Sequence, residues 1–467
     1  MKKIWIFLIS ILMVYSVIAQ SNSYRILLRV EGYSDTLAYL GHYFGDKLSI
    51  SDTVSALEGE IRLTGDEPLK QGVYFIVSQD KRKLFEFIIG KDQEFEIQTS
   101  LTASAHDAMV SGSTDNELFF GYLRFNRESY ERIKTLQSGL QKLDANNDSV
   151  RIIREQINEI NTQNIDYKLN IINNNPESFV ALLFNAMREP EVPDFFLPNG
   201  RHDSLATYLY YRNHYWDHID LGDDRFLRTP VFHRKLEMYF SEVIPAHPDS
   251  IVGEIDKIIA KTKENDEMRN YLLWYFTNRY ETSNVMGYDR IFVHMVDHYF
   301  TGRSYDWLHP VVQENMIAHV DKLRKLLIGE YAPQLLMADT ANNFINLHTI
   351  DAEYLVIIFW SSTCGECRSE LKTLNDLYLE TDVDLKVFAI NTDTSFSKWK
   401  EYIKKHKLDW IHVNGNLSLT GDYHDIYDIY STPVIYLLDE QKVIIAKRIA
   451  AKNIAAFMGR NKKGKTN

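Results

Sequence analysis

The stretch from Tyr354 to Leu371 constrains this chain most, because it contains both of the protein's cysteines. Tyr354 to Trp360 is an unbroken run of aliphatic and aromatic residues, which is typical of a strand buried on both faces of a parallel sheet. Three small polar residues follow. Cys364-Gly365-Glu366-Cys367 then opens a helical pattern whose leucines recur three residues apart. The sequence therefore predicts a strand that passes into a helix at Cys364.

This position favours redox chemistry at the two cysteines. The free backbone N–H groups and the dipole at a helix N-terminus favour a thiolate over a thiol. Two residues between the sulfurs on a first helical turn allow a disulfide that opens and closes by thiol–disulfide exchange. A zinc site would need further ligands, yet the chain has no second cysteine pair and no histidine within twenty positions after Cys367. We predict that Cys364 is the attacking thiolate and Cys367 the resolving thiol.

The residues around this pair resemble a known family. Phe-Trp is followed by three residues and then by two cysteines that are separated by two residues. Further along the chain, Thr432-Pro433 precedes the apolar run Val434–Leu438. Together with Gly-Glu-Tyr-Ala-Pro at 329–333 and Glu370, this pattern resembles the thioredoxin fold, and more narrowly the exported TlpA/ResA-type proteins of the thiol-specific antioxidant superfamily. The resemblance covers residues 329–459, less than a third of the chain.

The resemblance implies roles for three residues outside the cysteine pair. Pro433 matches the family's cis-proline, rather than an ordinary trans turn proline, and packs against the cysteines. The backbone of Thr432 would then pair with an extended substrate segment by strand addition. Glu370 would handle protons, and the alternative for it is a solvated helix carboxylate. The resemblance thus implies a protein-disulfide site without cofactor or metal.

The chain also departs from the thioredoxin pattern at three positions. Thr363 stands where tryptophan usually precedes the first cysteine, Glu366 replaces the usual proline, and Ile358 matches the buried aspartate. The carboxylate of Glu366 should oppose a thiolate beside it, because like charges at close range repel. Of the residues around the pair, we expect Trp360, Thr363, Gly365 and Glu366 to contact substrate.

The N-terminus indicates export. Lys2 and Lys3 precede an apolar core at 4–18 that ends at Ala19, so residues 1–19 read as a secretory signal peptide. With the resemblance, this places the protein in the periplasm or cell envelope of a Gram-negative bacterium. The net charge of −12 argues against nucleic acid as a partner. Because an exported protein normally uses cysteines for structural disulfides, a single pair in this motif favours catalysis.

The chain divides into three predicted domains after the signal peptide. Residues 20–112 show short alternating strands and predict a β-sandwich-like domain. Residues 113–328 show helical periodicity, and residues 329–467 alternate strands and helices as a thioredoxin-like α/β domain. Two phrases in the helical region, at 214–240 and 284–300, resemble a helical domain of unknown function. We expect any homo-oligomer to form through this region.

Two pairs of histidines in the helical region are candidate metal ligands. His294 and His298 are four residues apart, as are His214 and His218, a spacing that can chelate a metal on a helix. The first pair lacks the glutamate that a zinc protease places after its first histidine. We interpret both pairs as packing and hydrogen-bonding residues, and predict no metal.

The predicted function is that of a thiol–disulfide oxidoreductase. We expect a disulfide reductase acting on disulfide-containing exported proteins, with a membrane thiol protein as electron donor. Two alternatives remain. The chain could be an envelope binding module whose redox pair senses or locks a partner, or a thiol-dependent peroxidase of the antioxidant family. A peroxidase normally needs proline and threonine upstream of its cysteine at fixed spacing, and Thr363 next to Cys364 does not supply that.

Overall fold

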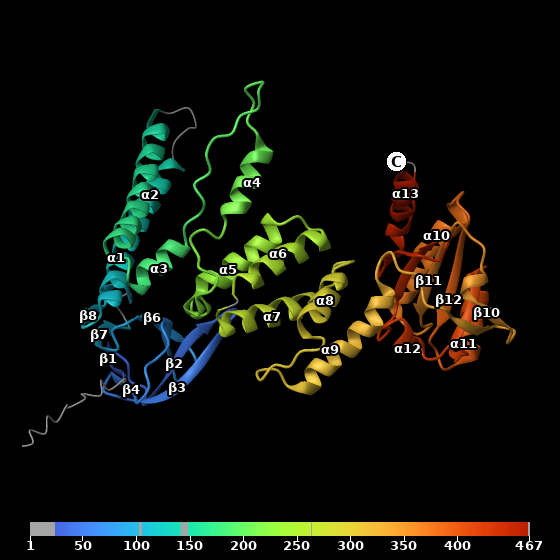
Figure 1. Cartoon of the computed structure of the whole chain (residues 1–467), viewed down its shortest axis with the longest axis horizontal. Helices are drawn as coiled ribbons and strands as arrows, with labels where there is room; N and C mark the ends of the chain where they lie inside the picture. Colours follow the sequence, from blue (N-terminus) through green and yellow to red (C-terminus); the bar gives the residue numbers. More distant parts are fainter. Residues whose placement is uncertain (1–23, 102–104, 142–147, 263, 466–467) are drawn as a thin grey trace, which may run out of the picture. The chain divides into compact units, whose positions relative to one another are not determined.

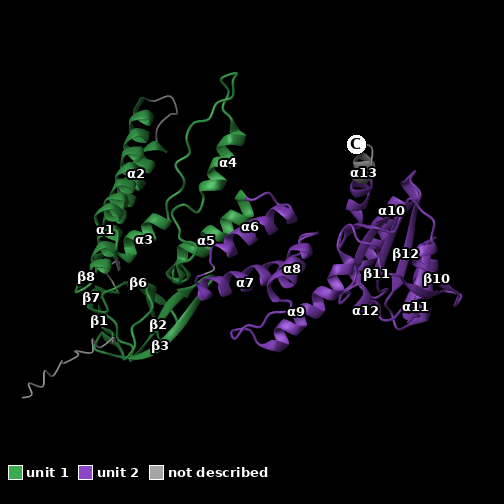
Figure 2. Cartoon of the chain, in the orientation of Figure 1, with its two compact units in different colours: residues 1–243 green, residues 244–467 purple. Residues whose placement is uncertain are grey.

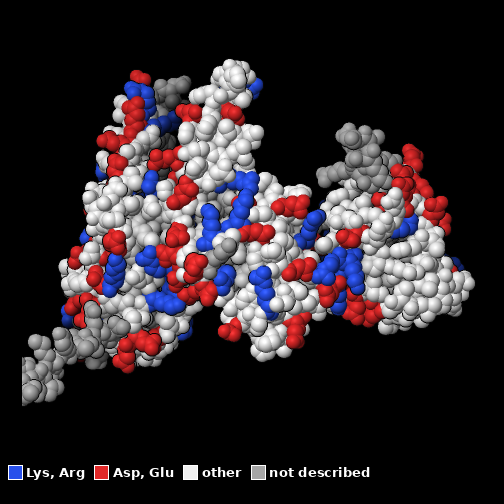
Figure 3. Space-filling model, in the orientation of Figure 1, with Lys and Arg blue, Asp and Glu red and all other residues white. Residues whose placement is uncertain are grey.

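The computed structural model describes residues 24–101, 105–141, 148–262 and 264–465, so the predicted signal peptide lies outside the described residues. The chain forms two compact units, Met1–Val243 and Ile244–Asn467 (Figure 2). The helical region predicted at 113–328 is thus shared by both units. Among the described residues, no helix is both long and apolar enough to cross a membrane. On the face drawn in Figure 3, Lys and Arg side chains are interspersed with Asp and Glu over each unit.

The first unit begins with eight strands (Figure 1). They are β1 (Tyr24–Glu31), β2 (Leu37–Phe44), β3 (Lys47–Leu57), β4 (Glu60–Gly65), β5 (Gly72–Ser78), β6 (Lys83–Ile89), β7 (Glu94–Ser100) and β8 (Met109–Ser111). The strands form one sheet in the order β6-β5-β2-β3-β4-β1-β7-β8. Every pairing is antiparallel except β1 with β7.

This sheet folds over a single hydrophobic core: β3 pairs with β2 in one half and with β4 in the other, as the predicted sandwich-like domain requires. Alternate residues of β1, including Ile26 and Leu28, are buried, as the period-2 pattern of a half-buried strand requires. Phe87 of β6 and Phe95 of β7 come from strands near opposite ends of the strand order, yet their rings lie 6.3 Å apart. The sheet therefore bends until its two ends share one core.

Helices complete the first unit. They are α1 (Thr114–Leu140), α2 (Asp148–Asn174), α3 (Phe179–Ala186), α4 (Ser204–His214) and α5 (Pro230–Met238), with short turns η1 (Ala105–Asp107), η2 (Asp224–Arg228) and η3 (Tyr239–Val243). The first two helices pack together: Phe125 of α1 stacks on Tyr167 of α2 with ring centroids 4.5 Å apart. Ser113 caps α1 by accepting the Asn116 N–H.

The helix α1 is tied to the edge of the sheet by a buried amide. Asn116 Oδ1 accepts the backbone N–H of Ile88 in β6 at 2.8 Å, and its Nδ2 donates to the Ile88 carbonyl at 2.7 Å. Because β6 ends the strand order, these groups have no further strand to pair with. The side chain therefore takes the place of a neighbouring strand at this residue.

The second unit starts with helices that precede the α/β domain. They are α6 (Pro248–Ala260), α7 (Asp266–Glu281), α8 (Asp289–Met295) and α9 (Pro310–Leu323), with η4 (Val296–Phe300) and η5 (Arg324–Leu326). Prolines occupy the first turn of α6 and α9, where their missing N–H costs no helical hydrogen bond. The loop from 282 to 288 joins α7 to α8.

The α/β domain has a seven-stranded sheet in the order β10-β9-β13-β12-β11-β14-β15. Its elements are β9 (Leu336–Asp339), β10 (Phe344–Asn346), η6 (Leu347–Thr349), β11 (Tyr354–Trp360), α10 (Gly365–Glu380), β12 (Leu385–Asn391), α11 (Phe396–His406), β13 (Ile411–Ser418), α12 (Tyr423–Ile426), β14 (Val434–Asp439), β15 (Ile444–Lys447), η7 (Ala451–Asn453) and α13 (Ile454–Lys465). The central strand β11 pairs parallel with β12 and antiparallel with β14. This is the predicted thioredoxin-like topology, and the three-part architecture of strands, helices and α/β domain is confirmed.

The strand β11 is buried on both faces, as its composition predicted. Leu355, Ile357 and Phe359 belong to one hydrophobic cluster. Tyr354, Val356, Ile358 and Trp360 belong to another, which also contains Cys367 and Leu371 of α10. Two packed cores therefore hold the strand end that leads to Cys364, and a rigid scaffold of this kind is what a precise site needs.

Candidate functional site

Cys364 is the N-cap residue of α10. Its backbone is extended, with φ −80° and ψ 122°, and its sulfur accepts the backbone N–H of Cys367 at 3.1 Å. The side chain is partly exposed, because the chain turns from β11 into the helix at this point. A hydrogen-bond donor and a helix N-terminus at the sulfur are the surroundings that stabilise a thiolate. The predicted placement of Cys364 at a strand-to-helix junction is confirmed.

Cys367 lies inside the protein. Its relative exposure is 0%, and both cysteines are free thiols in this structure. Burial raises the pKa of Cys367 to about 11, and its hydrogen bond with the Cys364 sulfur acts in the same direction. A reagent or substrate in solution can therefore reach Cys364 but not Cys367.

The segment before β14 lies against the first cysteine. The Thr432–Pro433 peptide bond is cis, as the resemblance implied. The Cys364 thiol donates to the Thr432 carbonyl at 3.5 Å, so residues 68 positions apart meet at the sulfur. Thr432 and Pro433 are both partly exposed, and they border the space that a substrate approaching Cys364 would occupy.

Asp393 supports the turn that carries Cys364, and the sequence analysis did not single it out. It follows β12, the strand next to β11, and its carboxylate accepts hydrogen bonds from the Ser361 hydroxyl and from the Ser362 N–H at 2.9 Å. Burial raises the pKa of Asp393, but these bonds and one from Asn391 outweigh burial and hold it below its usual range. The sequence did contain a signal for this role: Asp393 is a polar residue just after β12, the strand that pairs in parallel with β11.

The residues expected to contact substrate fall into two groups. Thr363, Gly365 and Glu366 are exposed around the cysteine turn. Trp360 has a relative exposure of 0% and packs 5.3 Å from the Tyr402 ring. Its assignment as a substrate contact is therefore wrong, because alternation along β11 directs this side chain into the core beneath α10.

Glu370 is held by a backbone contact. Its Oε2 accepts the N–H of Ala451 at 2.6 Å, which fixes the carboxylate against η7 on the C-terminal side of the sheet. The side chain is partly exposed and is therefore not simply a solvated helix carboxylate. Its role in handling protons remains a prediction.

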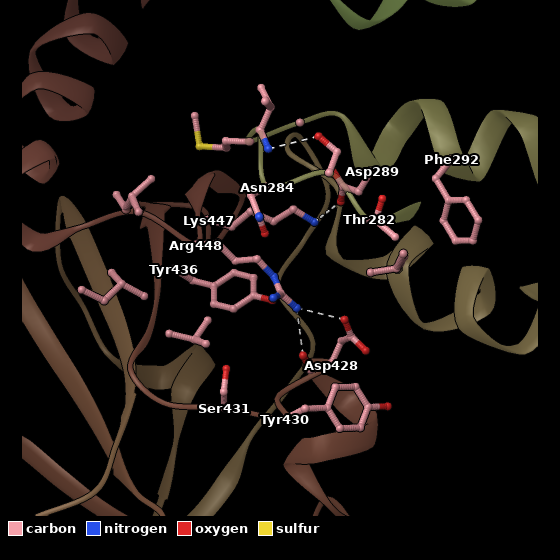
Figure 4. Close-up of a pocket in the computed structure, with 18 of the residues that line it drawn as sticks. Thr282, Asn284, Asp289, Phe292, Asp428, Tyr430, Ser431, Tyr436, Lys447 and Arg448 are labelled. Carbon is pink, nitrogen blue, oxygen red and sulfur yellow. Dashed lines mark hydrogen bonds and ion pairs between the residues drawn. The ribbon is translucent and has the colours of Figure 1, made fainter. Parts of the chain in front are cut away.

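A cavity of about 540 Å³ lies beside these residues (Figure 4). Glu366, Glu370 and Pro433 line it from the α/β domain. The α7–α8 loop, residues 282–288, contributes Val285 and Met286 from the helical part of the same unit. The sequence alone does not place this loop at the site, because it is some eighty residues away in the chain from Glu366.

Ion pairs surround the cavity. The Lys447 ammonium pairs with Asp289 and also donates to the Leu326 carbonyl at 2.6 Å. Arg448 donates to Asp428 at 2.9 Å, and Figure 4 shows both cations extending toward their carboxylates. Burial lowers the pKa of Lys447, although Asp289 opposes that shift. These contacts join the helices to the last strand of the sheet.

His319 of α9 belongs to the same group of charges. Its Nε2 lies 3.7 Å from Asp428 Oδ2, and its Nδ1 lies 3.5 Å from Glu281 Oε1. Hydrogen bonding to Asp428 and then to Glu281 raises the pKa of His319 to about 9, against the opposing effect of burial. The imidazole is therefore charged at neutral pH.

We expect His319→Gln to remove a pH dependence of stability. The pKa of His319 is raised in the folded protein from its ordinary value of 6.5 to about 9. The protonated imidazole therefore stabilises the folded state fully below pH 6.5, and this stabilisation is lost as the pH rises through about 9. Urea unfolding at pH 6 and pH 9.5 should show the wild type losing stability relative to the variant. His247→Gln, at a side chain 68% exposed, is the matched control. An equal loss in wild type and His319→Gln would contradict the expectation.

The histidine pairs of the helical region form ordinary contacts. His294 Nε2 lies 2.9 Å from Asp256 Oδ1, and its ring stacks on His298 with centroids 5.3 Å apart. His214 Nδ1 lies 2.6 Å from Asp217 Oδ2. In the described part of the chain, no three His, Cys, Asp or Glu side chains come together in a way that could hold a metal ion.

A central strand leading to a dithiol at a helix N-terminus, opposite a cis-proline, defines the class of thioredoxin-like thiol–disulfide oxidoreductases. Residues 328–447 match the AhpC/TSA family, and residues 153–325 match DUF5106, a domain of unknown function. The C-terminal domain is thus a thioredoxin-like domain of the TlpA/ResA type, preceded by a DUF5106 region.

Individual relatives cover mainly this C-terminal domain. The chain is 22% identical over 127 residues to the thiol-disulfide oxidoreductase ResA of Bacillus cereus, which is 27% of this chain and 71% of the relative. A solved domain of a possible thiol-disulfide isomerase from Cytophaga hutchinsonii is 35% identical, with 30% of this chain and 97% of that one covered and a TM-score of 0.28. A thioredoxin-like protein from Bacteroides caccae is 16% identical, with 58% and 99% covered and a TM-score of 0.43.

Proposed function

We propose that the protein is a disulfide reductase that acts on disulfide-containing exported proteins through the Cys364–Cys367 dithiol. The observation that carries the proposal is the contrast between the two sulfurs: Cys364 is partly exposed at a helix N-terminus, and Cys367 is buried behind it. The predicted signal peptide at 1–19 supports action on exported proteins.

The reaction follows from this arrangement in two exchange steps. The Cys364 thiolate attacks one sulfur of the substrate disulfide, forming a mixed disulfide and releasing the other substrate sulfur as a thiolate that takes up a proton. Cys367 then loses its proton and attacks the Cys364 sulfur, which releases the second substrate thiol. The substrate gains two electrons and two protons, and the enzyme becomes the disulfide. A thiol donor, which we propose to be a membrane dithiol protein, reduces it again.

The substrate would lie along the segment before β14. The Thr432 backbone is partly exposed next to Cys364, so it can pair with an extended chain by strand addition, which gives affinity through main-chain hydrogen bonds. We propose that Glu370, fixed against Ala451, accepts or returns the proton of the buried Cys367 during the second step.

Two activity assays on the full chain separate this function from the alternatives. We expect the protein to accelerate the reduction of insulin disulfides with dithiothreitol as final donor, and not to accelerate hydrogen peroxide consumption. Turnover of peroxide without turnover of insulin would instead make it a thiol peroxidase. If neither substrate is turned over while the dithiol still cycles chemically, the redox pair serves a binding module.

A further inference from the structure

We propose that the α7–α8 loop is a second wall of the substrate site, and that this site selects an extended disulfide-bearing segment with a basic side chain beside its cysteine. The inference rests on the proposed function and names its substrate class. The α7–α8 loop belongs to the region that matches a domain of unknown function, and this region would thus help to select the substrate.

The loop and the redox turn line one cavity. Val285 and Met286 face the same space as Glu366 and Pro433. Its volume of about 540 Å³ lies within the ~300–1,000 Å³ that binding pockets usually have. Pro433, the residue after Thr432, lines this cavity, so we expect a substrate segment that pairs with Thr432 to run on into it and meet the loop. A protruding segment should then be a better substrate than a flat protein surface.

The loop is anchored where it meets the α/β domain. Met286 is partly buried and packs against the hydrophobic cluster that contains Trp360 and Cys367. The ring of Tyr288 lies 5.7 Å from that of Tyr280 in α7, so both ends of the loop are packed. Val285, between them, is 55% exposed and has no such packing role. It offers a position at which charge can be changed without disturbing the core.

The charges around the cavity do not balance. Five carboxylates line it, while its cations are Lys447, Arg448 and His319. Each cation already faces a carboxylate. Lys447 pairs with Asp289 and Arg448 with Asp428. His319 lies between Asp428 and Glu281.

Two carboxylates remain after these pairings. Glu370 is hydrogen-bonded to a neutral backbone N–H. Glu366 is exposed and has no ion pair or hydrogen bond with any residue that the structure describes. Among the residues that line the cavity the uncompensated charge is therefore negative, and Glu366 lies two residues from Cys364. Complementary charge on a partner favours encounter and register, so a cationic substrate side chain is the match for this site.

Synthetic peptides test the preference directly. Three peptides with the same intramolecular disulfide carry Lys, Gln or Glu beside one cysteine and are otherwise identical. We expect the reduced full-length protein to reduce the Lys peptide about tenfold faster than the Glu peptide at low salt, with Gln between them. The ratio should fall as salt screens the charges. Equal rates for all three peptides overturn the inference and leave the proposed function standing, whereas no reduction of any peptide overturns the proposed function.

Single substitutions test which residues make the preference. Val285→Lys should bring the Lys-to-Glu rate ratio close to one, because it adds a cation to the opposite wall, and Glu366→Gln should lower the ratio as well. Val311→Lys is the matched control: this valine is 52% exposed on α9, in the same unit but outside the cavity lining. If neither Val285→Lys nor Val311→Lys changes the Lys-to-Glu rate ratio, the loop is not part of the site.

Discussion

Replacing Cys364 by serine is expected to lower disulfide turnover by at least about three orders of magnitude, because it removes the nucleophile. Replacing Cys367 by serine should also stop turnover, but after one attack. With no thiol behind Cys364, the mixed disulfide with substrate cannot be resolved and accumulates. Because Cys367 is buried, it cannot replace Cys364 as the attacking thiol. The two variants should therefore differ clearly in the amount of mixed disulfide that they form.

Mass spectrometry of the full chain after incubation with an oxidised peptide measures this difference. Cys367→Ser should show a covalent adduct that dithiothreitol removes, and Cys364→Ser should show none. Wild-type protein treated with limiting iodoacetamide should be alkylated at Cys364 first. An adduct on Cys367 in the Cys364→Ser variant, or preferential alkylation of Cys367, would reverse the assigned roles.

The second large effect is expected at Lys447. Its side chain is 5% exposed and bonds both Asp289 and the Leu326 carbonyl. Lys447→Ala leaves a mostly buried carboxylate without its cation, and breaking a buried pair in this way costs roughly 3 kcal/mol of unfolding free energy. Urea unfolding should show this loss of unfolding free energy. Amide hydrogen exchange should show that α8 and β15 lose protection together.

Two further variants make the Lys447 result specific. Lys452→Ala, at an exposed lysine five residues further on, should have little effect. The double change Lys447→Met with Asp289→Leu replaces the ion pair by apolar side chains and should recover most of the lost stability. A double variant as unstable as Lys447→Ala would mean that packing, not charge, governs this contact.

The sequence allowed the redox site to be placed because its determinants are local. The β11 run, the small polar turn and the cysteine spacing all lie within 18 residues. Trp360 is close to Cys364 in sequence, but side-chain alternation along β11 turns it away from the substrate. Tyr354, Val356, Ile358 and Trp360 share one face of the strand, so Trp360 belongs to the core.

Other features could not be predicted because they depend on distant or weak signals. The strands β8, β9 and β10 carry a weak sequence signal because they have only three or four residues each. The cavity depends on segments near 285, 366 and 433, which only the folded chain brings together. The sandwich-like N-terminal domain was predicted, but contacts between strands distant in the strand order, such as Phe87 with Phe95, were not.

The amide of Asn116 has a consequence for how this chain behaves among other extended polypeptides. An unprotected edge strand offers its N–H and C=O groups to any other extended chain, and association of that kind leads toward aggregates. Asn116 occupies both groups of Ile88 at the β6 edge, while the opposite edge, β8, is only three residues long. The first unit is thereby less exposed to being recruited by other extended chains into insoluble material.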